Sequence, residues 1–380
     1  MKKHSIKKKI SQIHKKGDHK PLHLHSKNHL PIRGDKETKP IHLEAKRRML
    51  PEYKNSTLSK KEVAILNNKL DNTIKELKKV VVGQDKIIES ALICLLANGH
   101  MLIEGLPGIA KTLIVRALAK VMGLKFERIQ FTSDLLPADI IGVTVFEPTK
   151  KDFYVVKGPI FANFVLADEI NRCPPKTQSA LLEAMQERNV TIGKSEYRLD
   201  HPFLVVATQN PIEHLGVYPL PEAEIDRFLF KVFMKYPLKE EEFNILHKNI
   251  EIKSLEEYNI KKVLSVSDIL KLQKATKDVY VDPKINKYIV EIVSHTRMAV
   301  GLKMSRYIQW GASPRATIGL NLAARANALL QGRNFVTAHD VKTVAHNVLR
   351  HRILLNYEGQ AESIKTDDIV DEILARTKVL

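Results

Sequence analysis

The residues best suited to chemistry lie between His100 and Thr112, where the chain reads HMLIEGLPGIAKT. An apolar run precedes a turn rich in glycine and proline, and Lys111 begins an amphipathic segment. This order predicts a strand, a phosphate-binding loop and a helix, because backbone N–H groups at a helix N-terminus attract an anion. Lys111 would add a positive charge, and the Thr112 hydroxyl would bind Mg²⁺. The other residues expected around the phosphates are Gly105, Leu106, Pro107, Gly108, Ile109 and Ala110.

A second apolar run, Phe164 to Ala167, ends in the adjacent carboxylates Asp168 and Glu169. A nucleotide hydrolase uses such a pair in two roles: the first holds Mg²⁺ beside Thr112, and the second polarises the water that attacks the γ-phosphate. Both can reach one ligand crevice, because the chain turns where a parallel strand ends. An ordinary acidic loop after a strand is the alternative. Together with the phosphate loop, the pair predicts a nucleotide hydrolysis site.

Three further polar residues are candidates for the same site. Asn210 follows the apolar run Phe203–Ala207, and the end of a parallel strand would point it and Thr208 into the same crevice as Asp168 and Glu169. The Asn210 amide could hold the attacking water or the γ-phosphate; an asparagine that caps its own turn is the alternative. Arg227 lies in the run Asp226-Arg227-Phe228, with apolar residues close by on both sides. Arg315 lies in the first turn of a predicted helix, where a bound phosphate would offset the unfavourable position of a cation. For either arginine, a plain salt bridge is the other interpretation.

The elements that must position these residues alternate between strands and helices up to about residue 236. Phe126–Gln130 predicts another strand and Lys176–Glu187 a helix. Such alternation is typical of a parallel sheet with helices on both faces. The runs Val143–Val156 and Val190–Leu199 are short alternating pairs around polar turns, so we predict two β-hairpins inserted into this α/β core.

After Pro237 the pattern is helical to the end of the chain. The residues predicted to cap successive helices are Ser267, Asp282, Ser313, Thr337 and Thr366. We therefore predict two folded units: an α/β nucleotide-binding domain over residues 56–236 and a helical domain over residues 237–380.

The positive charge is concentrated before these domains. Residues 1–61 hold 18 of the 61 Lys and Arg residues, 5 of the 43 acidic residues and few large apolar side chains. A segment with so little apolar surface cannot offset the entropy of ordering, so residues 1–55 are predicted to be a disordered, basic and His-rich tail. The tail is either only solvated or makes a weak contact with a polyanion such as nucleic acid.

The remaining composition restricts the class of protein. No apolar stretch reaches the length of a transmembrane segment, and no signal peptide is evident. Cys94 and Cys173 are the only cysteines, so we expect no disulfide framework. A reducing, cytoplasmic location fits this composition.

In their order along the chain, these motifs resemble the MoxR family of AAA+ ATPases over about residues 62 to 356. That family commonly has alanine before the loop lysine, as Ala110 is here. The segments that carry the resemblance are Val82–Gln84, Gly105–Thr112, Gln130–Pro137, Gly158–Asn163, Ala167–Arg172, Lys176–Glu187, Ala207–Pro211, Tyr218–Glu222, Asp226–Phe228 and Ser313–Ala316.

The resemblance implies an AAA+ core, in which the two hairpins are the helix-2 and pre-sensor-1 insertions, followed by a helical lid. Residues 105–112 would be the Walker A loop that binds ATP, and Asp168 and Glu169 the Walker B pair. Asn210 would be sensor 1. Arg315 would be sensor 2, reaching the γ-phosphate from the lid.

The resemblance also implies an assembly. Arg227 would be the arginine finger, acting on ATP bound by a neighbouring subunit of a ring that is typically hexameric. Val81, Val82 and Gly83 would lie at the adenine. Members of the family are thought to remodel or activate a target, often with a partner that carries a von Willebrand factor A domain.

The leading hypothesis is therefore an ATP-hydrolysing, chaperone-like motor that drives maturation of, or metal insertion into, a partner protein. A nucleic-acid-dependent motor is the first alternative, because of the basic tail. A magnesium-chelatase-like subunit is the second, because its motor has the same general order of motifs.

Overall fold

The computed structural model describes residues 58–105, 111–211, 216–248, 255–298 and 301–379. The predicted tail, residues 1–55, and loop residues 106–110 lie outside the described residues. From Leu58 onward, the described residues belong to one compact unit, so the predicted division at residues 236 and 237 stays a prediction. Within this part of the chain, no helix combines the length and apolar character needed to cross a bilayer.

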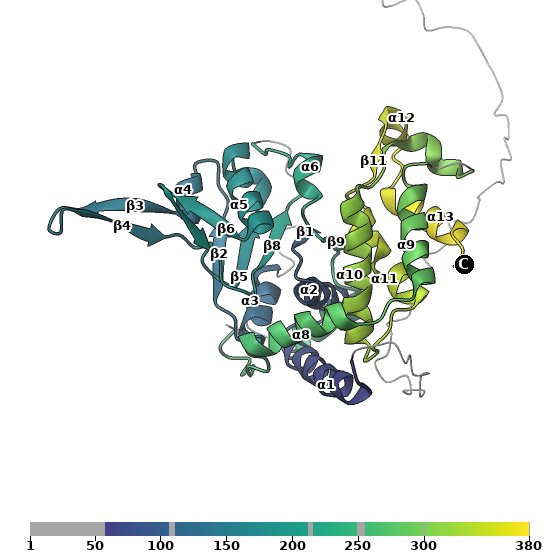
Figure 1. Cartoon of the computed structure of the whole chain (residues 1–380), viewed down its shortest axis with the longest axis horizontal. Helices are drawn as coiled ribbons and strands as arrows, with labels where there is room; N and C mark the ends of the chain where they lie inside the picture. Colours follow the sequence, from purple (N-terminus) through teal and green to yellow (C-terminus); the bar gives the residue numbers. More distant parts are fainter. Residues whose placement is uncertain (1–57, 106–110, 212–215, 249–254, 299–300, 380) are drawn as a thin grey trace, which may run out of the picture. The chain divides into compact units, whose positions relative to one another are not determined.

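A five-stranded parallel sheet carries the candidate site (Figure 1). From one edge to the other, its strands are β2 (Phe126–Gln130), β5 (Phe164–Asp168), β8 (Leu204–Gln209), β1 (Met101–Gly105) and β9 (Phe230–Met234). Every neighbouring pair is parallel. The predicted parallel sheet is confirmed.

Helices cover both faces of this sheet, because alternate residues of each buried strand point to opposite sides. One face packs with α2 (Asp85–Leu96) and α3 (Lys111–Val121), and its strand residues include Met101, Ile103, Phe164 and Leu166. The other face packs with α4 (Pro137–Ile141) and α5 (Pro175–Glu187), and its strand residues include Leu102, Val165, Ala167 and Val205.

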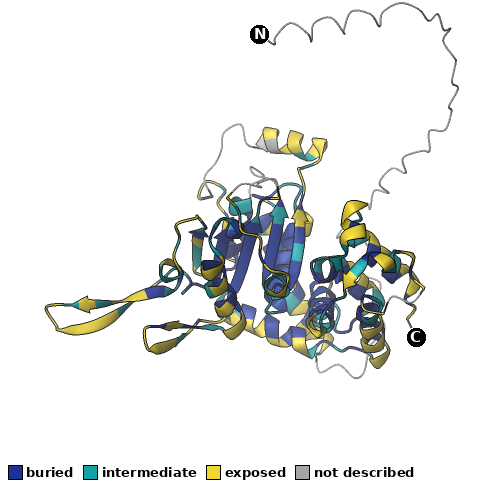
Figure 2. Cartoon of the chain, turned by 90° about the horizontal axis from the view of Figure 1, so that it is seen from above, coloured by how far each residue is buried: buried dark blue, intermediate teal, exposed yellow. Residues whose placement is uncertain are grey.

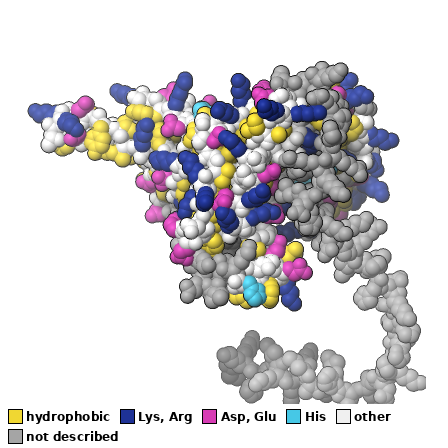
Figure 3. All heavy atoms as spheres, turned by 90° about the horizontal axis from the view of Figure 1, so that it is seen from below, with side chains coloured by type: hydrophobic (Ala, Val, Ile, Leu, Met, Phe, Trp, Pro, Cys, Tyr) yellow, Lys and Arg dark blue, Asp and Glu magenta, His cyan; other side chains and the backbone are white. Residues whose placement is uncertain are grey.

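Both predicted hairpins are present. The first consists of β3 (Gly142–Glu147) and β4 (Asp152–Lys157), and the second of β6 (Asn189–Ile192) and β7 (Ser195–Arg198). The β3–β4 hairpin projects from the sheet and is largely exposed (Figure 2). Phe146 is 48% exposed, Phe153 66% and Tyr154 48%. Apolar side chains on this projection are visible at the surface in Figure 3.

Helices form the rest of the described chain. They are α1 (Lys60–Leu77), α6 (Glu222–Ile225), α7 (Lys239–Lys248), α8 (Val266–Asp278), α9 (Pro283–His295), α10 (Pro314–Leu330), α11 (Ala338–Leu349), α12 (Tyr357–Ala361) and α13 (Thr366–Arg376). A short antiparallel pair, β10 (Ile308–Trp310) and β11 (Leu354–Leu355), and the 3₁₀ turns Ile170–Arg172 and Lys303–Tyr307 complete them.

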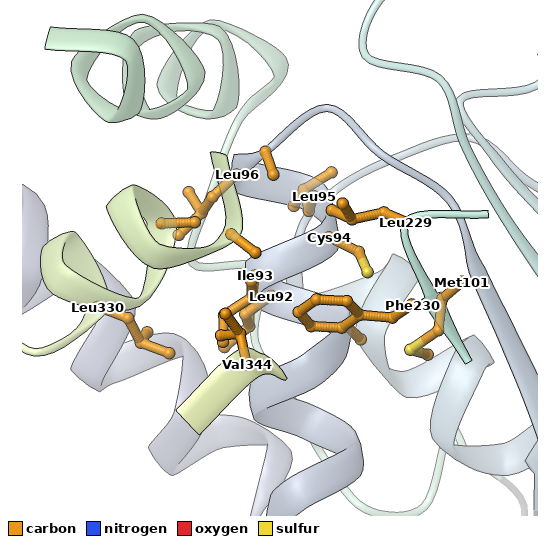
Figure 4. Packing of buried hydrophobic residues seen from close by; sticks show 14 of the residues in the cluster. Leu92, Ile93, Cys94, Leu95, Leu96, Met101, Leu229, Phe230, Leu330 and Val344 are labelled. Carbon is orange, nitrogen blue, oxygen red and sulfur yellow. The ribbon is translucent and has the colours of Figure 1, made fainter. Parts of the chain in front are cut away.

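The helices α10 and α11 share one apolar core with the sheet. Figure 4 shows Leu330 of α10 and Val344 of α11 near the buried side chains of α2, with Leu229 and Phe230 at the start of β9. Removing these apolar side chains from water stabilises the contact between α2, α10, α11 and the start of β9.

The predicted helix caps are partly right. The predictions that are confirmed are Asp282, Ser313 and Thr337. Ser267 is wrong, because Ser265 begins α8 with a capping box in which Asp268 is the third helical residue. Thr366 is also wrong by one position, because it is already helical and Lys365 is the N-cap.

Candidate nucleotide-hydrolysis site

The predicted site residues gather at the carboxyl ends of the central strands. Gly105 ends β1, Asp168 ends β5, and Thr208 lies near the end of β8. From β1 the chain crosses to β2 at one edge of the sheet, whereas its last strand in the sheet, β9, lies on the other side of β1. The direction in which strands are added therefore changes at β1. Open parallel sheets bind ligands at this kind of position. Lys111 begins α3, and its Nζ donates a hydrogen bond to the Gly105 carbonyl, at 2.7 Å.

Asp168 is held from two sides. Thr208 Oγ1 donates to Asp168 Oδ1 at 2.6 Å, and Arg128 on β2 donates to Oδ2 from Nε at 3.1 Å and from Nη2 at 2.7 Å. The aspartate is only 7% exposed. Because a buried carboxylate must be hydrogen-bonded or paired, these contacts account for a fixed negative charge at the end of β5.

Glu169 leaves the strand in a left-handed conformation, with φ 59° and ψ 49°. This conformation is uncommon for residues other than glycine. It is stabilised by Thr208, whose hydroxyl accepts from the Glu169 N–H at 2.9 Å. Glu169 Oε2 accepts from Gln130 Nε2 at 2.8 Å and lies 3.0 Å from Arg172 Nε. Because the chain turns at Glu169, the side chains of Asp168 and Glu169 need not point to opposite faces of the sheet, as neighbouring strand residues do.

Two more predicted residues lie at the ends of the elements that carry the site. Asn210 directly follows β8 and is 5% exposed, and Thr112 is the second residue of α3 and half-buried. The position of Asn210 after β8 agrees with an amide at the crevice edge, and its role as sensor 1 stays a prediction.

The predicted adenine segment lies just before α2. Val81 is buried, and Val82 and Gly83 are half-buried. Gly83 has φ +74°, and a Cβ at this position would be 2.4 Å from the carboxyl carbon of Glu241. The left-handed backbone conformation favours glycine here, whereas the Glu241 carboxyl is the flexible end of a side chain and can move aside. Contact of these residues with adenine stays a prediction.

The two predicted arginines lie together in a second cluster. Arg315 Nη2 donates to Gln186 Oε1 at 3.1 Å, and its Nη1 lies 3.7 Å from Asp226 Oδ2. Arg227 is half-buried, and its Nε is a buried atom without a hydrogen-bond partner among the described residues. A hollow of about 260 Å³ is lined by Ser179, Glu183, Gln186, Glu187, Glu224 and Arg227.

The sequence patterns gave no role to the arginine and glutamine side chains that hold these groups in place. Arg128 and Gln130 are two positions apart on β2, and the alternation of a strand could have indicated that they share one face. Arg172 is three residues after Glu169, and pairs with it across a 3₁₀ turn. Arg352 binds Asp226 at 2.7 Å across 126 positions, and no local signal identifies it.

The residue types at the carboxyl edge fit a magnesium nucleotide. Carboxylate and hydroxyl oxygens, supplied by Asp168 and Thr112, are ligands that Mg²⁺ prefers. Lys111, at the N-terminus of α3, brings positive charge to the end where a helix attracts anions. Arg227 is half-buried and lines the hollow, so part of its side chain is accessible from outside the chain, as an arginine finger requires.

Comparison with known proteins agrees with this geometry. Residues 100–230 match the ATPase family associated with various cellular activities (AAA), and residues 303–373 match the AAA lid domain. The sheet, the hairpins and the matched segments define an ATPase of the AAA class.

Full-length relatives narrow the class. Chaperone MoxR1 of Mycobacterium tuberculosis is 47% identical over 308 residues, which span 80% of this chain and 81% of that protein. YeaC of Bacillus subtilis is 45% identical over 82% of this chain and 94% of that protein. A crystal structure of a candidate ATPase from Cytophaga hutchinsonii has a TM-score of 0.78 at 46% identity, covering 84% of this chain and 97% of that one. The chain belongs to the MoxR family of AAA ATPases.

Proposed function

We propose that the chain binds MgATP at the carboxyl ends of β1, β5 and β8, and uses its hydrolysis to remodel a partner protein. The observation that carries this proposal is the double role of Thr208. Its hydroxyl donates to the Asp168 carboxylate and accepts from the Glu169 N–H, so one buried side chain fixes one carboxylate and the backbone that carries the other. Such preorganisation matters because fixed charges and dipoles need no rearrangement during the reaction.

The proposed roles follow from the side chains. Residues 105–110 and Lys111 bind the phosphates, and Asp168 and Thr112 hold Mg²⁺, which neutralises charge that develops on the phosphate oxygens. Glu169 orients the attacking water and takes up its proton at the carboxylate. Asn210 holds that water or the γ-phosphate through its amide.

We also propose that the active form is a homo-oligomer, most simply a hexameric ring. The support is the location of Arg227, a half-buried residue that lines the hollow described above. Gln186 lines the hollow that Arg227 lines and accepts from Arg315, so both arginines belong to one cluster. This favours joint action of Arg227 and Arg315 at an ATP bound by a neighbouring subunit.

The β3–β4 hairpin supports the remodelling role. A two-stranded hairpin is only marginally stable in water, and this one exposes Phe146, Phe153 and Tyr154. Exposed aromatic side chains on a projecting element are suited to contact another protein. The relative named Chaperone MoxR1 is consistent with a protein client. We include in this proposal that the chain acts with a partner that carries a von Willebrand factor A domain, and that remodelling serves metal or cofactor insertion.

Glu169→Gln tests the hydrolytic site. The variant should bind MgATP, because Lys111 and Asp168 remain, and its turnover should fall about 10²–10⁴-fold because the water loses its base. Glu127→Gln, on β2 but outside the hydrogen bonds described above, is the control and should keep normal turnover. Wild-type turnover in Glu169→Gln with ATP bound would disprove the assignment.

The same variant tests the remodelling role. Held in the ATP state, Glu169→Gln should retain client proteins that wild-type protein releases, and mass spectrometry of the purified complex identifies them. Adding Phe153→Ser should abolish this retention while ATP binding persists. Equal retention by Glu169→Gln with and without Phe153→Ser would mean that the hairpin does not contact the client.

A further inference from the structure

The carboxylate of Asp226 joins side chains from separate parts of the chain. Its Oδ1 accepts from Arg352 Nε at 2.7 Å, and its Oδ2 accepts from Ser313 Oγ at 2.9 Å. Arg315 Nη1 lies 3.7 Å from the same Oδ2. Ser313 is also the N-cap of α10, so the first turn of that helix is fixed to the residue that precedes Arg227.

Arg352 holds the main chain on both sides of Arg227. Its Nη2 donates to the carbonyl of Asp226 at 2.9 Å and to that of Phe228 at 2.7 Å, and its Nη1 donates to the carbonyl of Leu229 at 3.2 Å. His351 Nε2 lies 3.1 Å from the Phe228 carbonyl oxygen. The backbone that carries Arg227 is therefore bound before and after it by residues that follow α11.

Arg352 is suited to this task by its burial and its shape. Its side chain is 3% exposed, against 17% for that of Asp226. Burial lowers the pKa of the Arg352 guanidinium, and the Asp226 carboxylate opposes that shift. The guanidinium is planar and carries five N–H donors in a fixed arrangement, so a displacement of one carbonyl breaks its geometry with the others.

A nearby pair shows what a purely supporting contact looks like. Arg350, two residues earlier, binds Asp367 with Nε to Oδ1 at 3.0 Å and Nη2 to Oδ2 at 3.1 Å. Its side chain is also buried, at 9% exposed. Its Nη1 donates to the Lys231 carbonyl at 3.1 Å, within β9 and four residues after Arg227. The two pairs thus differ in whether they contact the segment around Arg227.

We infer that Asp226 and Arg352 are positioning residues, which hold Arg227 and Arg315 in one fixed arrangement for use on the neighbouring subunit's ATP. The inference rests on the proposed role of Arg227. By this inference, movement of α10 and α11 is transmitted to Arg227 through the Asp226 carboxylate and through the bonds of Arg352 to the carbonyls of Asp226, Phe228 and Leu229.

Asp226→Asn and Arg352→Lys test this inference, with Asp367→Asn as the matched control. Both test variants should lower kcat by about 10–100-fold, since an error of about 1 Å in placement costs about 10²-fold. The KM for ATP should stay within about twofold, because the variant's own phosphate loop is intact. Asp367→Asn should keep wild-type kcat. Thermal unfolding of all three proteins measures how much stability each loses.

Mixing experiments separate a positioning role from a structural one. Asp226→Asn mixed with Lys111→Ala should regain turnover, because some interfaces then join an intact ATP site to a correctly held Arg227. Asp226→Asn mixed with Arg227→Ala should not, because neither subunit supplies a functional arginine. If Asp226→Asn does not fold, Arg352→Lys is used in both mixtures.

Three outcomes overturn the inference. The first is wild-type kcat in both Asp226→Asn and Arg352→Lys while Arg227→Ala is inactive, which leaves the proposed role of Arg227 intact. The second is a loss that Lys111→Ala does not restore although it restores Arg227→Ala. The third is wild-type kcat in Arg227→Ala itself, which disproves the proposed finger and this inference together.

Discussion

The two charged clusters of this ATPase, one around Asp168 and one around Asp226, differ in whether the chain itself supplies hydrogen-bond partners for all their charged groups. At the ends of β5 and β8, Asp168 and Glu169 are both bonded by side chains of the same chain, and Thr208 links them. At the other cluster, Asp226 is fully engaged, whereas Arg227 beside it keeps a buried Nε without a partner among the described residues.

Under the proposed roles of these residues, this difference would separate the chemical step from its control. Preorganised carboxylates lower the barrier without rearrangement, so they can be built into a single subunit. An arginine that stabilises transition-state charge is most useful for regulation when another subunit supplies it, because hydrolysis then depends on assembly. The following predictions test whether the two clusters are distinct in this way.

Arg227→Ala should have the largest effect. We expect ATP to bind normally and turnover to fall about 10³-fold or more, because the charge on the transferring phosphate loses a partner. Mixing with Lys111→Ala should restore part of the activity, measured as phosphate release against mixing ratio. Subunit exchange without any recovery would mean that Arg227 acts within its own chain or only supports the fold.

Thr208→Val should have an intermediate effect, confined to the first cluster. The substitution keeps the shape but removes the hydroxyl that bonds to Asp168 and Glu169, so turnover should fall on the order of 10²-fold. Stability should decrease by about 1–3 kcal/mol. Mixing with Lys111→Ala should give no recovery, because the defect lies in the variant's own ATP site.

Thr177→Val is the control for buried hydroxyls. Thr177 is 2% exposed, and its Oγ1 donates to the Leu135 carbonyl at 2.8 Å. Its loss should lower the unfolding temperature as Thr208→Val does, with turnover near wild type. A comparable loss of turnover in Thr177→Val would show that general destabilisation, and not loss of the Thr208 hydroxyl from the site, lowers turnover.

Deleting residues 1–55 should have the smallest effect. Because the tail holds few large apolar residues, we expect unchanged thermal unfolding and basal turnover. Any polynucleotide binding should be lost with the tail, and its log–log salt slope should be about −0.7 to −0.9 per phosphate contact. Stimulation of the shortened protein by polynucleotide would instead favour a nucleic-acid-dependent motor.

Local patterns predicted much of the fold. β2 has the predicted bounds, both hairpins lie where the alternation placed them, and three of the helix caps are correct. Ser267 failed as a cap because two serines near one helix start compete, and only Ser265 has Asp268 at the right spacing. Spacing along the chain could identify Asp168 and Glu169, but not that Thr208 and Arg128 would hold them.

The sequence by itself determined the order of strands and helices, the phosphate-loop pattern and the adjacent carboxylates, because each depends on neighbours a few positions apart. Only the tertiary structure decided which side chains hold the site in place. Arg352 and Asp226 lie 126 positions apart, and Thr208 and Asp168 lie 40 apart. Such pairs form because the buried sheet and helices bring their polar groups together away from water, where each must find a partner.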